Sequence, residues 1–249
     1  MAIDRPRYDR WRDDLAAIVD RLPATELAAT IKAKVIDLVR REAARDDLSL
    51  REIRQLVDQL LGDDLAGYGR AIVDTYERIV ELTNEHYDDL GLDVARDFDR
   101  IRAVEAANSI DIGKYSSATK DRVAREVRAA LATGETVEEL IERIRPIDQK
   151  TEFYARTLGQ TLIKRHGRAL KNEKARRAEV DTFEYVGVVR PTTREFCRRH
   201  AGRTYALDTI LGLSNGNLEP VIENCGGWNC VHDWEPDPFA TETDDVPTD

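Results

Sequence analysis

The segment DTFEYVGVVR, residues 181–190, decides the fold, because the pattern of apolar residues changes there. Before it, apolar residues recur at helical spacing. Within it, aromatic and β-branched residues are concentrated in a short extended stretch typical of a strand, namely Phe183, Tyr185, Val188 and Val189. We therefore expect a mainly α protein: a helical arm or bundle followed by a small C-terminal α+β domain with few short strands.

Helical spacing extends over most of the chain that precedes this segment. Pro23 separates the first two helices, and Ser49 with Glu52 forms a capping box that opens the third. Gly62 is expected to end the third helix, because glycine favours the backbone conformation that closes a helix. We find no repeat of fixed period, which favours a bundle or an arm over a solenoid.

Glycine and proline also divide the later helices. Gly113 is expected to interrupt the helical region. A second capping box, Thr136 with Glu139, is expected to open a short helix that Pro146 ends. Residues 151–177 are then expected to form the last helix before the strand.

Beyond the first strand the elements become short. We expect a helix that Thr193 caps and that ends at His200, followed by a second strand near 203–205. Residues 207–213 are expected to form one more helix. The acidic tail, 239–249, is expected to be disordered because it contains few apolar residues.

The overall charge argues against a protein that coats DNA. The chain of 249 residues has a formal net charge of −10, whereas non-specific DNA affinity comes from neutralising phosphates with Lys and Arg. No apolar run approaches the roughly 20 residues needed to cross a bilayer, and the first ten residues lack the apolar core of a signal peptide. We therefore expect no membrane contact and synthesis in a cytoplasm.

One helix departs from this acidic balance, because residues 164–177 contain seven basic residues and one acidic residue. Two interpretations stay open. The favoured one is a solvated helix face, since charge runs usually lie in solvent, and the other is a contact with nucleic acid. The side chains concerned are chiefly Lys164, Arg165, Arg168, Lys171 and Lys174.

The three cysteines are expected to be thiols or metal ligands, because they are odd in number and a reducing compartment disfavours disulfides. Cys197 and His200 lie three apart, which on a helix places both side chains on one face. Cys230 and His232 flank one residue of an extended segment and also share a face. These two pairs could form a tetrahedral zinc site, with Cys225 as an alternate ligand.

A metal-free interpretation is also open and is favoured, because the ligand spacings fall outside the usual zinc-finger ranges. In it, the cysteines are small buried hydrophobes and His232 donates a hydrogen bond to a loop carbonyl. No other cofactor is expected. In both interpretations Cys197, Cys230 and His232 should lie close together, since they belong to one small domain.

The cysteines and histidines belong to a longer motif. It consists of Thr193-Arg194-Glu195-Phe196-Cys197, then Gly202, and later Gly226-Gly227-Trp228-Asn229-Cys230-Val231-His232 with Pro236. The order and spacing resemble the C-terminal domain of the Mu F-like phage head-morphogenesis proteins, which show a Thr-Arg-x-x-Cys turn and a closing Asn-Cys-x-His element near a proline. The helix with Ala155-Arg156-Thr157 is also similar to one that precedes this domain in the family.

The resemblance covers about residues 136–238. It implies a helical N-terminal region, 1–135, and a head-morphogenesis domain, 136–238, with an α+β core at 181–238. It also implies a minor head (capsid) protein of a tailed phage or related virus, located in the head or head-neck region of the virion after assembly in the host cytoplasm. Portal protein and major capsid protein are then the expected partners, with packaged DNA as a secondary contact.

Within the motif, Arg194 is expected to anchor a loop through hydrogen bonds to carbonyls or a carboxylate. Gly226-Gly227 is expected where the backbone needs positive φ or close approach. Gly202 and Asn229 are the other structural positions of the motif. Trp228 and Trp234 are expected to pack over the small core, which is favoured over a stacking platform for bases.

Two other functions were weighed. A zinc-dependent nucleic-acid-binding module would use the Cys/His cluster and the basic helix. A hydrolase is disfavoured, because we identify no oxyanion site or third orienting group beside Cys197 and His200, and no carboxylate cluster for magnesium. The expectation is a protein that binds other proteins, has no catalytic residues and takes no small-molecule substrate.

Overall fold

The computed structural model describes residues 5–42, 49–91, 93–133 and 137–238. This part of the chain is mainly helical with a small three-stranded antiparallel sheet near its C-terminal end, so the predicted fold class is confirmed. It forms two compact units: the sheet unit, from the described parts of 1–20, 75–106 and 160–249, and the bundle unit, from those of 21–74 and 107–159. The predicted domain limits at 135 and 238 stay a prediction.

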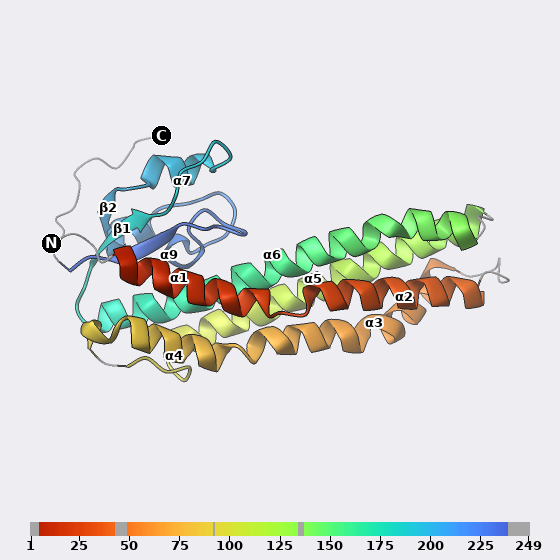
Figure 1. Cartoon of the computed structure of the whole chain (residues 1–249), viewed down its shortest axis with the longest axis horizontal. Helices are drawn as coiled ribbons and strands as arrows, with labels where there is room; N and C mark the ends of the chain where they lie inside the picture. Colours follow the sequence, from red (N-terminus) through yellow and green to blue (C-terminus); the bar gives the residue numbers. More distant parts are fainter. Residues whose placement is uncertain (1–4, 43–48, 92, 134–136, 239–249) are drawn as a thin grey trace. The chain divides into compact units, whose positions relative to one another are not determined.

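The bundle unit consists of four helical segments that lie side by side (Figure 1). They are α2 (Ala24–Glu42), α3 (Leu50–Val73), residues 107–133 of α5 (Asp99–Thr133) and residues 137–159 of α6 (Val137–Arg177). Ion pairs join α3 to two neighbours, with Lys34 Nζ 2.6 Å from Asp64 and Lys120 Nζ 2.6 Å from Asp58. The buried Tyr68 hydroxyl donates to the carbonyl of Ala155 on α6 at 2.6 Å.

The helix limits in this unit confirm some sequence signals and correct others. The capping box of Ser49 and Glu52 opens α3 as predicted. However, α3 continues through Gly62, α5 continues through Gly113, and α6 continues through Pro146. A glycine costs a helix about 1 kcal/mol and a proline about 3 kcal/mol, and burial of a long apolar stripe offsets costs of this size. The predicted cap residue Thr136 lies outside the described residues.

The sheet unit combines longer helices with the sheet and several short elements. The helices are α1 (Arg5–Asp20), α4 (Tyr76–His86), the 3-10 turn η1 (Asp88–Leu90), the start of α5 and residues 160–177 of α6, followed by α7 (Glu195–His200), α8 (Leu207–Leu211) and α9 (Val221–Asn224). The strands are β1 (Thr182–Val186), β2 (Thr204–Ala206) and β3 (Asp233–Pro236). The helix predicted over 207–213 is thus shorter, and α9 and β3 were not predicted.

β1 is the central strand, and both of its pairings are antiparallel. Phe183 lies opposite Tyr205 of β2, and Tyr185 lies opposite Trp234 of β3. All four side chains are fully buried, so the aromatic residues of the three strands form the core of the sheet. This confirms the predicted packing of Trp234, whereas Trp228 is only half-buried.

The turn between β1 and α7 differs from the prediction. Arg194 and not Thr193 is the N-cap of α7, and no side chain caps this helix. The Thr193 hydroxyl instead accepts a hydrogen bond from the backbone N–H of Arg190 at 2.7 Å, which closes the turn at Pro191.

The predicted acidic tail lies outside the described residues. Within the described ranges, every helix is too short or too polar to span a lipid bilayer.

Candidate metal centre

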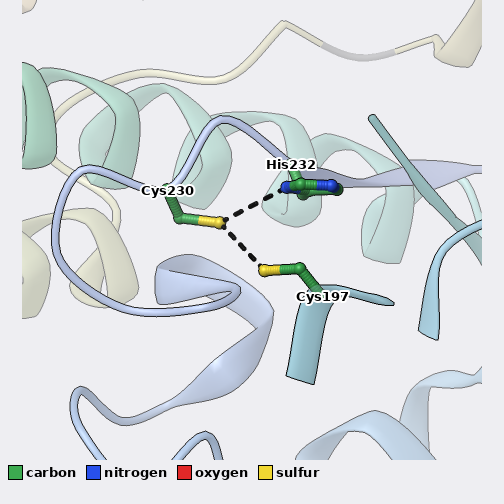
Figure 2. Close-up of side chains that lie close together, drawn as sticks. All are labelled: Cys197, Cys230 and His232. Atoms are coloured by element: carbon green, nitrogen blue, oxygen red, sulfur yellow. Dashed lines mark hydrogen bonds between the residues drawn. The ribbon is translucent and has the colours of Figure 1, made fainter. Parts of the chain in front are cut away.

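Cys197, Cys230 and His232 meet in the sheet unit, as predicted (Figure 2). Their ligand atoms all lie within 4.8 Å of one another, and all three residues are buried. The two sulfur atoms are 3.6 Å apart, and Sγ of Cys230 is 4.0 Å from Nδ1 of His232. Residues 33 positions apart in the sequence are therefore brought together by the fold.

These distances fit a tetrahedral metal ion. With Zn–S bonds of about 2.3 Å and Zn–N bonds of about 2.1 Å, tetrahedral geometry places two sulfurs about 3.8 Å apart and a sulfur and a nitrogen about 3.6 Å apart. The observed separations agree to within about 0.4 Å. The third separation, between Cys197 Sγ and the His232 ring nitrogen, is within 4.8 Å, so the two thiol groups and the imidazole lie close to the positions that a tetrahedral ion requires.

Hydrogen bonds from Arg194 hold the two halves of the motif together. Its guanidinium donates to the carbonyl of Gly226 at 3.1 Å and to that of Trp228 at 2.6 Å. The predicted anchoring of a loop by Arg194 is confirmed. Since Arg194 immediately precedes α7, these bonds fix the helix that carries Cys197 against the loop that carries Cys230.

Two glycines allow this loop to approach the sulfur atoms. A Cβ on Gly226 would clash with Cys197 Sγ, lying closer than real Cβ contacts allow, and would make a tight contact of 3.2 Å with Cys230 Sγ. The backbone N–H of Gly226 donates to Cys230 Sγ at 3.2 Å. Gly227 has a φ of 92°, so both predicted reasons for the glycine pair are confirmed.

The other two structural positions of the motif also have positive φ, 75° at Gly202 and 57° at Asn229. The N–H of Gly202 donates to the carbonyl of Tyr185 at 2.8 Å, which returns the chain to the sheet. The N–H of Asn229 donates to the hydroxyl of Thr161 on α6 at 2.9 Å. These residues therefore shape the two loops that bring the ligands together.

Tyr185 belongs to the centre although its role was not predicted. Its hydroxyl lies 3.3 Å from Cys197 Sγ and 3.9 Å from Cys230 Sγ, and its ring stacks on that of His232 at 5.6 Å. Burial raises the pKa of Tyr185 well above its ordinary value. The aromatic strand pattern predicted a buried side chain here, but its place beside the sulfurs depends on the β1–β3 register, which the sequence does not specify.

The two thiols share a hydrogen bond, which separates their acidities. Donation by Cys197 to Cys230 raises the pKa of Cys197, and burial raises it further. The same bond lowers the pKa of Cys230, with help from His232 and the guanidinium of Arg168. Cys230 is therefore the sulfur that this environment favours as a thiolate.

His200 does not join the cluster, so the predicted four-ligand set is wrong at this position. Its Nδ1 lies 2.9 Å from the Tyr205 hydroxyl, and its ring packs on Phe196 at 4.4 Å. Burial lowers the pKa of His200 to about 4, with a smaller effect from Arg199 and Arg203. The spacing in α7 does put Cys197 and His200 on one face, but this short helix directs the imidazole toward β2.

Cys225 is not an alternate ligand in this arrangement. It is fully buried with a φ of 49°, and it lies outside the only metal-binding group found among the described residues. Burial raises the pKa of Cys225 well above its ordinary value, as expected for a thiol used as a small hydrophobe.

Arg176 and Arg177 at the end of the basic run are exposed, but the predicted exposure is wrong for the five basic residues that precede them. These side chains lie in the interior of the sheet unit, because α6 is covered by α1, α4 and the C-terminal segment. Their exposed fractions are 8% for Lys164, 5% for Arg165, 3% for Arg168, and 0% for Lys171 and Lys174. They form neither a solvated face nor a surface that DNA could contact.

Arg168 instead holds the metal-binding loop. Its guanidinium donates to the carbonyls of Cys230 at 3.1 Å, His232 at 2.6 Å and Glu223 at 3.2 Å. Hydrogen bonds to a buried charged group are worth more than those between neutral groups. Arg168 is therefore a positioning residue, since it fixes the backbone of both ligands that follow α9.

Lys171 forms the centre of a buried charge network one helical turn further along α6. Its Nζ lies 2.8 Å from Asp233 and 3.2 Å from Glu235, and 4.6 Å from the ring centroid of Trp11. The hydroxyl of Tyr87 donates to Glu235 at 2.8 Å. The network pins β3, which directly follows His232, to α6.

The three ligand residues line one wall of a hollow of about 300 Å³. Its other lining residues come from the turn before α7 and from the metal-binding loop: Val188, Arg190, Thr192, Thr193, Arg194, Asn229 and Val231. The candidate centre is therefore accessible from one side, although its residues are buried.

Comparison of the chain with models of known protein families, with curated proteins and with solved structures finds no match.

Proposed function

We propose that the chain is a minor head protein of a tailed phage or a related virus, and that its sheet unit contains a zinc ion and binds other head proteins. The observation that carries this proposal is the convergence of the two motif halves that resemble the Mu F-like family. Arg194 and Cys197 of the first half contact Gly226 and Cys230 of the second half directly. The motif therefore acts as one structural unit, as a shared family feature would.

Zinc is the metal that suits this donor set. Two thiolates and an imidazole are soft to borderline ligands, whereas magnesium and calcium require oxygen ligands. The strands of the sheet contain only three to five residues, and a metal clip contributes folding energy to small domains of this kind. The ion would join α7 to the segment before β3.

The alternative of a nucleic-acid-binding module loses the feature that supported it. That function needs basic side chains that face phosphates, but five of the seven in the basic run of α6 are buried, and Lys171 among them is paired within the unit. A protein partner is favoured by exposed apolar side chains near the hollow, since Val188 is 57% and Val231 is 49% exposed. Portal protein and major capsid protein are the partners that we propose.

The metal is tested by elemental analysis of the purified full-length protein. We expect about one zinc ion per chain, loss of the ion in Cys230→Ala, and a lower unfolding midpoint after chelation. Cys225→Ala is the matched control, because it removes a buried thiol of the same unit that is not a ligand. Metal-free wild-type protein that is unaffected by chelators would contradict the zinc proposal.

The head function is tested separately by co-expression with the portal and capsid genes of the same genome. We expect to find the protein in purified procapsids and in pull-downs of the portal. The amount recovered with the portal should fall as salt is raised, because salt screens contacts between charged surfaces. Recovery of the protein only in the free fraction, absent from procapsids and virions, would contradict a head function whether or not zinc is bound.

A further inference from the structure

We infer that the metal keeps one coordination position open to the hollow, and that this position takes an anionic oxygen ligand that enters through the hollow. The inference rests on the zinc site proposed above and extends it. It starts from the number of ligands. Among the described residues the metal-binding group contains three members, Cys197, Cys230 and His232, whereas zinc in proteins is almost always four-coordinate.

The surroundings of the cluster decide where the fourth position faces. Gly226 closes one side, since even a Cβ there would clash with Cys197 Sγ. The hydroxyl of Tyr185 closes a second side at 3.3 Å and 3.9 Å from the two sulfurs. Neither of these residues lines the hollow, whereas all three ligand residues do. The remaining access to a metal ion is therefore from the hollow.

The lining of the hollow selects an anion. It carries the two arginines Arg190 and Arg194 together with Thr192 and Thr193, and among the described residues that line it none is acidic. A zinc ion with two thiolates and a neutral imidazole has no net charge, so an anionic fourth ligand would leave one negative charge. Guanidinium groups nearby would compensate that charge and donate hydrogen bonds to its oxygens.

The ligand class is thus an anionic oxygen donor, either a carboxylate or a phosphate. A carboxylate would come from an acidic side chain of another protein, and a phosphate from solution or a phosphorylated group. A structural zinc site is closed by four protein ligands, whereas an open position marks a site that exchanges ligands. The metal centre would then serve as a binding point as well as a clip.

The test uses the full-length protein with cobalt(II) in place of zinc, titrated with acetate and separately with inorganic phosphate at constant ionic strength. We expect a thiolate-to-cobalt charge-transfer band that persists, and ligand-field bands that change saturably with one of the anions. A response to acetate assigns the position to carboxylates, and a response to phosphate assigns it to phosphates. If the charge-transfer band is present but neither anion changes the ligand-field bands, the open position is overturned and the metal site is not.

A protein that forms no charge-transfer band with cobalt would overturn both the metal site and this inference.

The location of the open position is tested by comparing two variants. Arg190→Gln removes a positive charge from the hollow, and Arg198→Gln removes one from the exposed face of α7. We expect the anion affinity to fall by up to about fivefold in the first variant and to stay unchanged in the second. Equal weakening in both variants would overturn entry through the hollow.

Discussion

Helix α6 contains two stretches that place their charges in opposite environments. In the bundle unit, Arg156 pairs with Glu152 at 2.9 Å, and the two side chains are 46% and 34% exposed. In the sheet unit, every residue from 161 to 175 is buried, including Lys171, which is fully buried between Asp233 and Glu235. One continuous helix therefore carries both a surface ion pair and a buried charge network.

The difference shows that the number of charges in a helix does not determine what they do. A surface pair contributes at most about 1 kcal/mol because water solvates both partners. A buried pair has given up its water, so removal of one partner leaves an uncompensated charge that costs about 3–5 kcal/mol. Burial, and not sequence composition, separates the two stretches of α6.

The largest effect is expected for Lys171→Met, which keeps an unbranched side chain one heavy atom shorter and removes its charge. Asp233 and Glu235 would then remain buried with weaker compensation, Arg168 at 3.4 Å and Arg7 at 3.5 Å. We expect the free energy of unfolding to fall by about 3 kcal/mol or more, measured by urea denaturation.

A combined variant provides the control for this experiment. Adding Asp233→Asn and Glu235→Gln to Lys171→Met should recover much of the loss, because the buried carboxylates are then neutral. If the triple variant is no more stable than Lys171→Met, packing and not uncompensated charge explains the loss.

The next effect concerns two glycines in different environments. Gly226→Ala should destabilise the sheet unit by about 1–3 kcal/mol through overpacking and reduce zinc affinity, because the new Cβ would meet Cys197 Sγ. Gly62→Ala in α3 should instead stabilise by about 0.5–1 kcal/mol, since the nearest atom to its Cβ is 3.9 Å away. Urea denaturation and zinc titration of both variants measure the contrast, and equal effects would contradict the close approach at the metal centre.

A smaller, pH-dependent effect is expected from His166, which is fully buried on α6 and stacks on Tyr76 at 4.1 Å. Burial lowers its pKa from 6.5 to about 3, with a further effect from Arg96. The folded-state pKa is below the unfolded value, so the stability from the neutral ring is present above pH 6.5 and is lost as the pH falls toward 3.

His166→Phe should remove this acid sensitivity and keep the aromatic stack. Relative to wild type, the variant should gain about 1–2 kcal/mol between pH 7 and pH 5, measured by urea denaturation at both values. If the difference in free energy of unfolding between the variant and wild type is the same at pH 7 and pH 5, His166 does not take up a proton on unfolding in this range.

The fold class and part of the candidate centre could be predicted from the sequence, because they depend on local patterns. The change of period at residue 181 indicated the strand, and the capping box at Ser49 marked the start of α3. Helix ends could not be predicted in the same way. Gly62 and Pro146 carry local costs that tertiary packing overrides, and packing is not visible in one segment.

In the candidate centre, too, the features that depend on a local motif could be predicted, and those that depend on tertiary packing could not. Cys197, Cys230 and His232 belong to a recognisable motif, but Tyr185, on another element, reaches them only through the sheet register. His200 was misplaced because helical spacing fixes a face and not the neighbour that the side chain meets.

The basic run was misjudged because its counterions are distant in the sequence. Lys171 pairs with Asp233 and Glu235, which are 62 and 64 positions away and which lie shortly before the acidic tail. The complementary charge of these two segments was the signal available. When a basic helix and an acidic segment occur in one small domain, two structures are compatible with the sequence. The two segments can pair with each other in the interior, or each can lie on the surface in contact with water.

The smallest effect is expected for Arg156→Gln, which breaks the surface pair on the same helix as Lys171. The guanidinium also donates to the Thr25 hydroxyl at 2.8 Å, but water can replace both partners because all three side chains lie on exposed surface. We expect a loss below about 1 kcal/mol that decreases further as salt screens the pair, measured by urea denaturation at low and high ionic strength. A loss as large as that of Lys171→Met would show that burial does not separate the two stretches of α6, and that the position along the helix matters in some other way.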